Sequence, residues 1–358
     1  MGRETLGARI AIMGTGAVGA YAGAHMAQAG EDVTFIDMWP ENVEAMRANG
    51  LRVTHLRDVP EFVTPVTALH LTEVQKISRG QPFDIVFICT KSYDTEWAAV
   101  MMRQYLAPGG FMVSLQNCMN EATIAGVVGW GRTLGAIASS ITVDLAAPGH
   151  VKRASGKGGA AHTVYRVGEV HGRITDRARA VCALVALSDS ALVTSNLWGE
   201  RWSKLVTNGM GNGMSACTGM ISGDILTNDA LRRFTARLGS EAIRTGQALG
   251  YTLEEIHHLD PEIIARAGEG DAEAVAEYDA HRLAEAARGG GAHRPSMGQD
   301  MVKGRRTEIA FINGYIVDRA AEIGMATPAN AALTRIVQQV ERGELQAGPE
   351  HILNLRLN

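Results

Sequence analysis

The sequence predicts an α/β protein, with a doubly wound sheet in the N-terminal half and an all-helical C-terminal half. Three observations lead to this prediction. A glycine-rich turn near the N-terminus joins an apolar strand to a helix. Apolar strand-like runs then alternate with helical segments as far as residue 195, as in βαβ units. From Asn196 onward the apolar residues recur at helical spacing. We therefore predict two domains, residues 1–195 and 196–358.

The composition is that of an ordinary globular chain. Its 358 residues suffice for two cores, and 46% are hydrophobic and 20% charged, with a formal net charge of −4. This charge does not favour binding to nucleic acid or to an anionic membrane. No apolar run reaches the ~18 residues of a membrane span, and no signal-peptide pattern is recognisable. The four scattered cysteines lack metal or redox spacing, so we expect reduced thiols and a cytoplasmic protein.

The segment Arg9–Gly30 has the order strand, glycine-rich turn, helix. The apolar strand RIAIM is followed by G-x-G-x-x-G and then by an alanine-rich helix that ends near Gly30. In such a turn the first glycine permits a tight bend, the second lets backbone approach a pyrophosphate, and the third allows close helix–strand packing. This context predicts a Rossmann-type dinucleotide site. The predicted cofactor-binding residues of the turn are Gly14, Gly16, Ala17, Val18 and Gly19.

Asp37 ends the second predicted strand, DVTFID, and bears on the choice of cofactor. A carboxylate at this point can accept hydrogen bonds from both ribose hydroxyls and would repel a 2′-phosphate. The following residues, MWPEN, offer no Arg or Lys to receive such a phosphate. The sequence therefore favours NAD over NADP, and the alternative is a solvated strand-end aspartate without this role.

Two more buried strands end in polar side chains. FDIVFICTK ends at Lys91 and GFMVSLQN ends at Asn117. Ligands of open α/β sheets lie beyond the carboxyl ends of the strands, so both side chains could reach cofactor or substrate. A solvated loop lysine and a turn asparagine are the alternatives. The rest of this half is predicted to contain a strand in 133–145, two antiparallel strands in 149–156 and 163–170, a helix in 175–187 and a strand in 191–195.

The stretch KLVTNGMGNG, Lys204–Gly213, is unusual within a helical segment. On a helical wheel Lys204, Asn208, Asn212 and Ser215 share one narrow arc. A solvated face is the alternative, but three glycines and two asparagines cost a helix about 4 kcal/mol, which favours a functional face approached by a ligand. Lys204 could stabilise and protonate the alkoxide that forms when hydride arrives, and the asparagines could bind substrate or orient Lys204.

The C-terminal segment Arg294–Leu333 predicts a long helix, a turn near Gly324 and a second helix. Ser296 is a plausible N-cap. Glu308 lies among apolar residues, so it needs a partner if it is buried, and Lys204 is the obvious candidate.

The charged and alanine-rich stretch His257–Arg294 precedes this segment and predicts one or two surface helices and a glycine-rich loop. This stretch could be a lid over the site or an insertion without function, and the sequence leaves both alternatives open. His257 and His258 are adjacent, so they face different ways on a helix, and no cysteine joins them. We therefore predict no metal site.

Taken together, five motifs resemble the ketopantoate reductase (2-dehydropantoate 2-reductase) family, in order and over nearly the whole chain. They are IMGTGAVGAYAGAHMAQAG, CTKSYDT, SLQNCMNE, WSKLVTNGMGNG and SMGQDMVKGRRTEIAFINGYIV…GMATPANAAL. The resemblance implies a Rossmann domain, a helical substrate and catalytic domain, and reduction of a 2-keto acid by a nicotinamide cofactor between them. It matches Lys204 to the catalytic lysine and Glu308 to its paired glutamate. By the same matching, Asn117 lies near the nicotinamide, Asn208 and Ser296 bind substrate, and Lys91 lies on the cofactor side.

The sequence departs from the family pattern at several points. The family usually uses NADPH and has a basic residue where Asp37 stands, which again favours NAD. LQNG reads LQNC here, with Cys118 in place of glycine, and Ser222 precedes Gly223 where the family often has asparagine. Ser296 and Glu308 would lie about 18 Å apart on an unbroken helix, so we expect RPSMG to be a loop bent back over the site.

Three functions remain open from the sequence. The first is a reductase or dehydrogenase that acts on a 2-keto or 2-hydroxy acid with NAD(H). The second is a catabolic NAD-dependent alcohol or hydroxy-acid dehydrogenase with a bulkier substrate. The third is a non-catalytic NAD(H)-binding sensor. We expect a small-molecule partner, and a homodimer through the helical domain.

Overall fold

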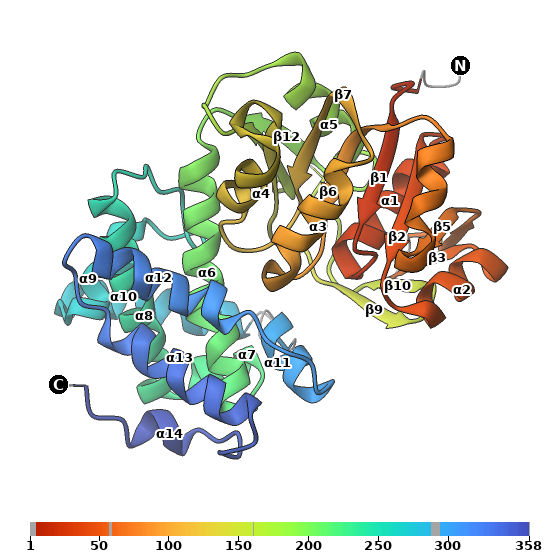
Figure 1. Cartoon of the computed structure of the whole chain (residues 1–358). Helices are drawn as coiled ribbons and strands as arrows, with labels where there is room; N and C mark the ends of the chain where they lie inside the picture. The colour runs from red at the N-terminus through yellow and green to blue at the C-terminus, as the bar shows by residue number, and fades with distance from the viewer. Residues whose placement is uncertain (1–4, 57–58, 160, 288–293, 358) are drawn as a thin grey trace. The chain divides into compact units, whose positions relative to one another are not determined.

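The computed structural model describes residues 5–56, 59–159, 161–287 and 294–357. The chain divides into two compact units, Met1–Leu197 and Trp198–Asn358 (Figure 1). Within the described ranges, no helix combines the length and the apolar character that crossing a membrane requires.

The first unit is built on an eight-stranded sheet with the order β12-β11-β8-β7-β6-β1-β2-β5. All neighbouring strands are parallel except β8 and β11. The strand order reverses between β1 and β6, and ligands of open α/β sheets bind at such a switch point. The strands are β1 (Arg9–Met13), β2 (Asp32–Asp37), β5 (Thr67–His70), β6 (Phe83–Ile88), β7 (Leu106–Ser114), β8 (Thr133–Ala138), β11 (Tyr165–Glu169) and β12 (Ala191–Thr194).

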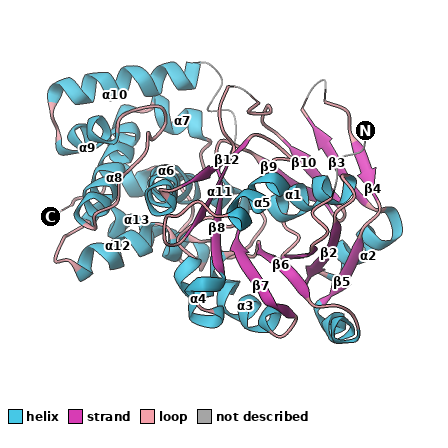
Figure 2. Ribbon diagram, turned by 90° about the horizontal axis from the view of Figure 1, so that it is seen from above, coloured by secondary structure: helices cyan, strands magenta, loops and turns pink. Residues whose placement is uncertain are grey.

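Helices cover both faces of this sheet (Figure 2). Successive residues of β1 point to opposite faces: Ile10 and Ile12 belong to one core cluster, and Ala11 and Met13 to the other. α1 (Ala17–Gln28) and α5 (Asp176–Val185) pack on the first face, and α3 (Thr95–Arg103) and α4 (Glu121–Val128) on the second. The remaining helical segments are α2 (Pro40–Asn49), η1 (Leu71–Arg79), η2 (Ser92–Asp94) and η3 (Trp130–Arg132).

A second, four-stranded sheet has the order β4-β3-β10-β9. Its strands are β3 (Leu51–His55), β4 (Phe62–Thr64), β9 (Val143–Ala147) and β10 (His150–Arg153). The predicted pairing of 149–156 with 163–170 is wrong, because β10 pairs with β9 and β3, whereas β11 pairs with β8 and β12. The single strand predicted in 133–145 is two strands in different sheets, divided near Ser140, whose φ is +54°.

A buried polar link holds the small sheet against the rest of the unit. Arg153 of β10 is fully buried and forms an ion pair of 2.5 Å with Asp189. Its guanidinium also donates to the hydroxyl of Tyr21 in α1 at 3.1 Å. Since a buried charge must be paired and hydrogen-bonded, this arrangement fixes the position of β10 beside α1.

The second unit is helical. Its described residues contain no strand, only an isolated bridge between Ile256 and Leu259. The long α8 packs against α7, α9, α12, α13 and α14. The predicted fold class is therefore confirmed. The helical elements are α6 (Leu197–Thr218), α7 (Ser222–Thr227), α8 (Asp229–Ala248), α9 (Pro261–Glu269), α10 (Ala272–Glu285), α11 (Ser296–Val302), η5 (Ile309–Phe311), α12 (Asn313–Glu322), α13 (Pro328–Glu341) and α14 (Glu350–Leu353).

The long helix predicted from Arg294 is wrong, because α11 ends at Val302. Gly304 follows with a φ of +61°, and Arg305 N donates to Asp300 O at 2.8 Å. A left-handed glycine just beyond a helix is a common terminator. The expected loop at RPSMG is also wrong from Ser296 onward, since α11 begins there. The chain instead turns between α11 and η5.

Candidate functional site

The glycine-rich turn connects β1 to α1 as the sequence predicts. Gly14 has a φ of +93°, and a Cβ atom there would lie 2.8 Å from Thr90 N. At Gly19 a Cβ atom would lie 2.5 Å from Gly14 O, so only glycine allows this packing. Around Gly16 a Cβ atom would meet no atom within 4 Å, which leaves the backbone open to an approaching group. Ala17 and Val18, both half-buried, are the first residues of α1, where backbone N–H groups lack helical partners.

Asp37 lies at the end of β2 and is 9% exposed, so it is not a solvated aspartate. Its Oδ2 accepts from Thr15 N at 2.8 Å and from the Thr15 hydroxyl, and its Oδ1 accepts from Trp39 N at 2.9 Å. Asn42 donates to Thr15 Oγ1 at 2.9 Å. A carboxylate can accept about four hydrogen bonds, so Asp37 has limited capacity left for a ribose.

Two loops beyond the carboxyl ends of β6 and β7 are tied together by amide side chains. Gln116 Nε2 donates to Thr90 O and to Thr95 Oγ1, both at 2.8 Å. Asn120 Nδ2 donates to Ser92 Oγ at 3.1 Å and to Asn117 O at 2.7 Å. This role of Gln116 and Asn120 was not predicted from the sequence, although both amides stand in the same motif, SLQNCMNE.

These hydrogen bonds bring Lys91 and Asn117 to neighbouring loops, and both residues are half-buried. Because β7, β6, β1 and β2 are consecutive in the sheet, Asn117, Lys91, the glycine-rich turn and Asp37 follow one another along one edge. Cys118 has a φ of +66°, a left-handed conformation that glycine adopts at no steric cost. Backbone conformation is thus one physical reason for a glycine at this point of the motif.

Lys204 lies on α6 and is half-buried. Burial lowers the pKa of its ammonium group from the ordinary value to about 8. Among the described residues it forms no hydrogen bond and no ion pair. One and two turns further along the helix, Asn208 and Asn212 are 7% and 8% exposed. The predicted polar arc therefore exists, and it is not a solvated face.

The three glycines of α6 have different surroundings. A Cβ atom at Gly213 would lie 2.8 Å from Leu333 Cδ2, and one at Gly209 would lie 3.2 Å from Ile316 Cδ1. These two glycines therefore serve helix packing, and their interpretation as space for a ligand is wrong. At Gly211 a Cβ atom would meet no atom within 4 Å. Since Gly211 is seven residues after Lys204, it shares the face of the lysine.

Ser215, the last member of the arc, is also part of the packing. A Cβ atom at Gly298 of α11 would lie 2.3 Å from Ser215 Oγ, so α11 sits directly on α6 at this point. Ser296 is exposed at the first position of α11, next to Pro295, which occupies the N-cap. The structure thus brings Ser296 to the C-terminal end of the arc.

Glu308 precedes η5 and is 4% exposed. The following residue packs on α6, since a Cβ atom at Gly213 would lie 3.1 Å from Ile309 Cδ1. Glu308 and Lys204 therefore belong to one packed assembly of the helical unit. The direct Lys204–Glu308 pair expected from the sequence is not formed, because Lys204 has no ion pair among the described residues.

Two asparagines of the last motif form a buried hydrogen-bond network. Asn313 Nδ2 donates to Gly209 O at 3.0 Å and to Asn330 Oδ1 at 2.9 Å, and both asparagines are fully buried. Asn330 Nδ2 donates to Glu241 at 2.9 Å, and Glu241 also accepts from Ala329 N at 2.9 Å. This network joins α6, α8, α12 and α13.

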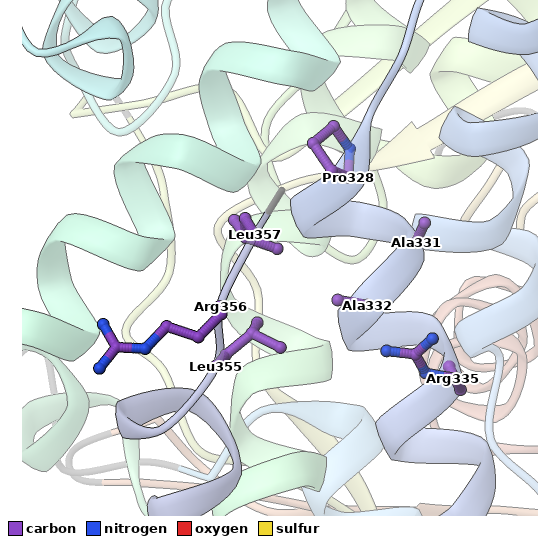
Figure 3. Close-up of a pocket in the computed structure, with 7 residues that line it drawn as sticks. All are labelled: Pro328, Ala331, Ala332, Arg335, Leu355, Arg356 and Leu357. Carbon is purple, nitrogen blue, oxygen red and sulfur yellow. The ribbon is translucent and has the colours of Figure 1, made fainter.

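A surface pocket of about 300 Å³ lies between α13 and the C-terminal residues. Pro328, Ala332 and Arg335 line one side, and Leu355–Leu357 line the other (Figure 3). None of the predicted site residues contributes to it, and its lining has no acid–base group suited to carbonyl chemistry.

The stretch that follows α8 contains α9 and α10, in agreement with the prediction of one or two helices. The glycine-rich loop predicted after them falls largely on residues 288–293, outside the described residues. His257 and His258 are not helical: they occupy a tight turn between Ile256 and Leu259. Across the described ranges, no cluster of three His, Cys, Asp or Glu side chains suits a metal ion.

Comparisons with known proteins agree with this arrangement. The family model described as "Ketopantoate reductase PanE/ApbA" matches residues 10–163, and "Ketopantoate reductase PanE/ApbA C terminal" matches residues 196–341. The 2-dehydropantoate 2-reductase of Archaeoglobus fulgidus is 30% identical over 94% of this chain and 98% of its own. That of Pyrococcus horikoshii is 27% identical over 93% of this chain and 97% of its own.

Solved structures share the whole fold. A PanE/ApbA family ketopantoate reductase from Ralstonia eutropha JMP134 is 27% identical, with a TM-score of 0.75, covering 94% of this chain and 99% of that one. A D-mandelate dehydrogenase in complex with NADH and anilino(oxo)acetate is 23% identical, with a TM-score of 0.78, and also covers 94% of this chain and 99% of its own. Since both halves and almost the full length match, the chain belongs to the ketopantoate reductase family, whose members are oxidoreductases that act on CH–OH groups.

Proposed function

We propose that this chain interconverts a 2-keto acid and the corresponding 2-hydroxy acid with NAD(H), and that Lys204 moves the proton. The observation that carries the proposal is the half-buried ammonium group of Lys204, without a partner among the described residues, on the polar face of α6. Burying a charge without a partner costs free energy. Such groups concentrate at functional sites, and burial has moved this pKa to about 8, close to the range in which a proton can be given and taken.

The edge of the sheet suits a nicotinamide dinucleotide. The open backbone at Gly16, at the start of α1, fits a pyrophosphate, and the residues that would hold the cofactor also include Gly14, Gly19 and Lys91. When bound, the cofactor supplies or accepts a hydride at C2 of the substrate. In reduction Lys204 donates its proton to the oxygen that becomes negative, which yields the 2-hydroxy acid. In oxidation neutral Lys204 takes the hydroxyl proton.

The other predicted residues would bind and orient the substrate. Asn208 and Asn212 lie one and two turns after Lys204 and can donate amide hydrogen bonds to a carboxylate. Ser296 adds a hydroxyl donor at the same end of the arc. Glu308 would hold the substrate hydroxyl close to Lys204, and Asn117 would contact the nicotinamide. These roles are supported by the family match. Asn208, Asn212, Ser296 and Glu308 also lie together in the helical unit.

We propose a preference for NAD(H) over NADP(H). Its support is the charge of Asp37 at the end of β2 and the absence of Arg and Lys in the next five residues, Met38–Asn42. The carboxylate of Asp37 already accepts four hydrogen bonds, from Thr15 N, the Thr15 hydroxyl, Trp39 N and Asn42 Nδ2. Repulsion of a 2′-phosphate, more than ribose binding, would therefore set the preference. The ratio of kcat/KM for NADH to that for NADPH should exceed one. It should fall in Asp37→Asn, which removes the charge and keeps an oxygen acceptor.

The test of the proton transfer is Lys204→Ala, with Lys152→Ala as control because Lys152 lies on the exposed side of β10. We expect turnover of Lys204→Ala to fall by about 10² to 10⁴, the usual contribution of an acid–base group, and turnover of Lys152→Ala to stay unchanged. A loss below about tenfold in Lys204→Ala would refute the assignment.

The first substrate to test is 2-dehydropantoate, since relatives that are 30% and 27% identical over nearly the whole chain are named 2-dehydropantoate 2-reductase. The alternative is NAD-dependent oxidation of a bulkier hydroxy acid, favoured by Asp37 and by Cys118 in place of glycine. Turnover of 2-dehydropantoate with NADH, compared with a panel of aliphatic and aromatic 2-hydroxy acids with NAD, separates the two. Tight NADH binding without turnover of any member would favour a sensor.

Assembly as a homodimer through the helical unit also stays a prediction. Light scattering should give twice the mass of one chain, and a monomeric mass at micromolar concentration would contradict it.

A further inference from the structure

A two-residue turn beside α6 holds two histidines in a strained backbone conformation. His257 and His258 have φ values of +54° and +61°, in the left-handed region that is uncommon for residues other than glycine. Ile256 and Leu259 exchange two backbone hydrogen bonds of 3.0 Å around them. The histidines therefore occupy the two central positions of a hairpin turn, where Asn-Gly is the usual choice. Strain of this kind persists where the surroundings fix it, and it concentrates at functional sites.

The helical unit fixes this turn from two sides. Ser203, the residue before Lys204, accepts a hydrogen bond at Oγ from Glu254 N at 2.8 Å. On the other side, His281 of α10 donates from Nε2 to the carbonyl oxygen of His257 at 2.8 Å. The segment that leads into the turn is thus anchored to α6 at Ser203, next to Lys204, and the turn itself to α10.

The two histidine rings lie in different surroundings. His258 is exposed, whereas the side chain of His257 is 20% exposed. Among the described residues neither ring nitrogen of His257 has a hydrogen-bond partner; the nearest carboxylate oxygen, of Glu285, is 3.9 Å from Nδ1. The charged and titratable groups around the ring are Lys204, His258, His281, Arg282 and Glu285.

These surroundings keep the ring neutral. Burial is the largest cause that holds the pKa of His257 well below its usual value, and the positive charges of Arg282 and Lys204 add to it. Lys204 follows Ser203, the residue that accepts from Glu254 just before the turn, so the turn and the lysine belong to the same part of the helical unit. A neutral imidazole that makes no hydrogen bond among the described residues is thus held at the segment of α6 that carries Lys204.

We propose that His257 is a substrate-binding residue of the Lys204 site, and that its ring hydrogen-bonds an oxygen atom of the keto or hydroxy acid. This inference rests on the function proposed above. A neutral imidazole has one N–H donor and one acceptor nitrogen, so it suits a carbonyl or carboxylate oxygen and also a hydroxyl group. It moves no proton in the reaction. Because it is neutral, it places no second positive charge next to the ammonium group.

The matched pair His257→Gly and His258→Gly tests the inference. Both substitutions remove a left-handed non-glycine residue from the same turn, so both should keep the fold. We expect kcat/KM of His257→Gly to fall about tenfold, mainly through KM, as for the loss of one substrate hydrogen bond. Imidazole added to the assay should restore part of it. His258→Gly should stay within about twofold of the unsubstituted protein.

Two results would overturn the inference. One is a kcat/KM of His257→Gly equal to that of His258→Gly; the other is a loss confined to kcat that imidazole does not rescue. If His257→Gly fails to fold, His257→Asn decides instead, since asparagine tolerates the left-handed conformation, and an unchanged KM in that variant would refute the role. An inactive unsubstituted protein would refute the proposed function itself. If the unsubstituted protein is active and the two variants have equal kcat/KM, only the role of His257 is refuted.

Discussion

The same substitution at two neighbouring glycines of α6 should have opposite effects on stability. Replacing a glycine inside a helix by alanine stabilises the helix by about 1 kcal/mol, partly because alanine restricts the unfolded chain. At Gly211 the added methyl would meet no atom within 4 Å, so the full gain should appear. We expect Gly211→Ala to raise the free energy of unfolding of the helical unit by about 1 kcal/mol.

At Gly213 the same gain is opposed by crowding. The added methyl would lie 2.8 Å from Leu333 Cδ2 and 3.1 Å from both Asn313 Oδ1 and Ile309 Cδ1. All three side chains are buried, and Asn313 is held by its hydrogen bonds. Overpacking of this kind costs about 1–3 kcal/mol, so the net change for Gly213→Ala should lie between about 0 and 2 kcal/mol of destabilisation.

Urea unfolding followed by helical circular dichroism measures both changes. The two variants differ from the parent by one methyl group in the same helix, so contributions from the unfolded state largely cancel between them. The expected difference is about 1–3 kcal/mol in favour of Gly211→Ala. Equal stabilisation of both variants would refute the packing role of Gly213. If the face of Lys204 binds substrate, Gly211→Ala should also raise KM, despite its greater stability.

Further predictions concern the pH profile, the buried ion pair and the strained cysteine. Since burial lowers the pKa of Lys204 to about 8, kcat/KM for reduction should fall and that for oxidation should rise as the pH passes through this value; profiles flat between about pH 6 and 10 would contradict the assignment. Arg153→Ala should cost about 3–5 kcal/mol in urea unfolding, because it leaves the buried carboxylate of Asp189 unpaired, and a loss under 1 kcal/mol would refute this. Cys118→Gly should change stability by less than about 1 kcal/mol, whereas Cys118→Val should cost more than about 2 kcal/mol, since a β-branched residue tolerates a φ of +66° poorly; equal melting temperatures would argue otherwise.

Local signals in the sequence were sufficient for the first βαβ unit. The strands at Arg9–Met13 and Asp32–Asp37 and the helix between them agree with the prediction, because strand, turn and helix chemistry stand next to each other in the chain. The small sheet was not foreseen. Its pairing joins β3 to β10 across nearly a hundred residues, and alternation within one strand does not specify such a partner.

The candidate site was also predicted only in part from the sequence. The polar arc of α6 was recognised because helical spacing is regular, but the roles of its glycines depend on which helices pack against it. A wheel places Gly211 on the face of Lys204 and Gly213 on the opposite face, but it does not show that Leu333 packs against Gly213 while Gly211 faces open space. His257 carried no sequence signal beyond two adjacent histidines, because its proposed role rests on a left-handed turn whose neighbour Glu254 bonds to α6 and whose carbonyl bonds to α10.

The hydrogen bonds of Asp37 have a consequence for attempts to exchange the coenzyme of this chain. The carboxylate that we propose to oppose a 2′-phosphate also accepts from the amide of Thr15. Asn42, which shares this network, accepts from Gly149 N at 2.8 Å between β9 and β10. Replacing Asp37 by arginine alone would therefore loosen both the glycine-rich turn and the edge of the small sheet. A redesign for the phosphorylated coenzyme would have to rebuild these positions as a group, so acceptance of it should be reached by coordinated substitution.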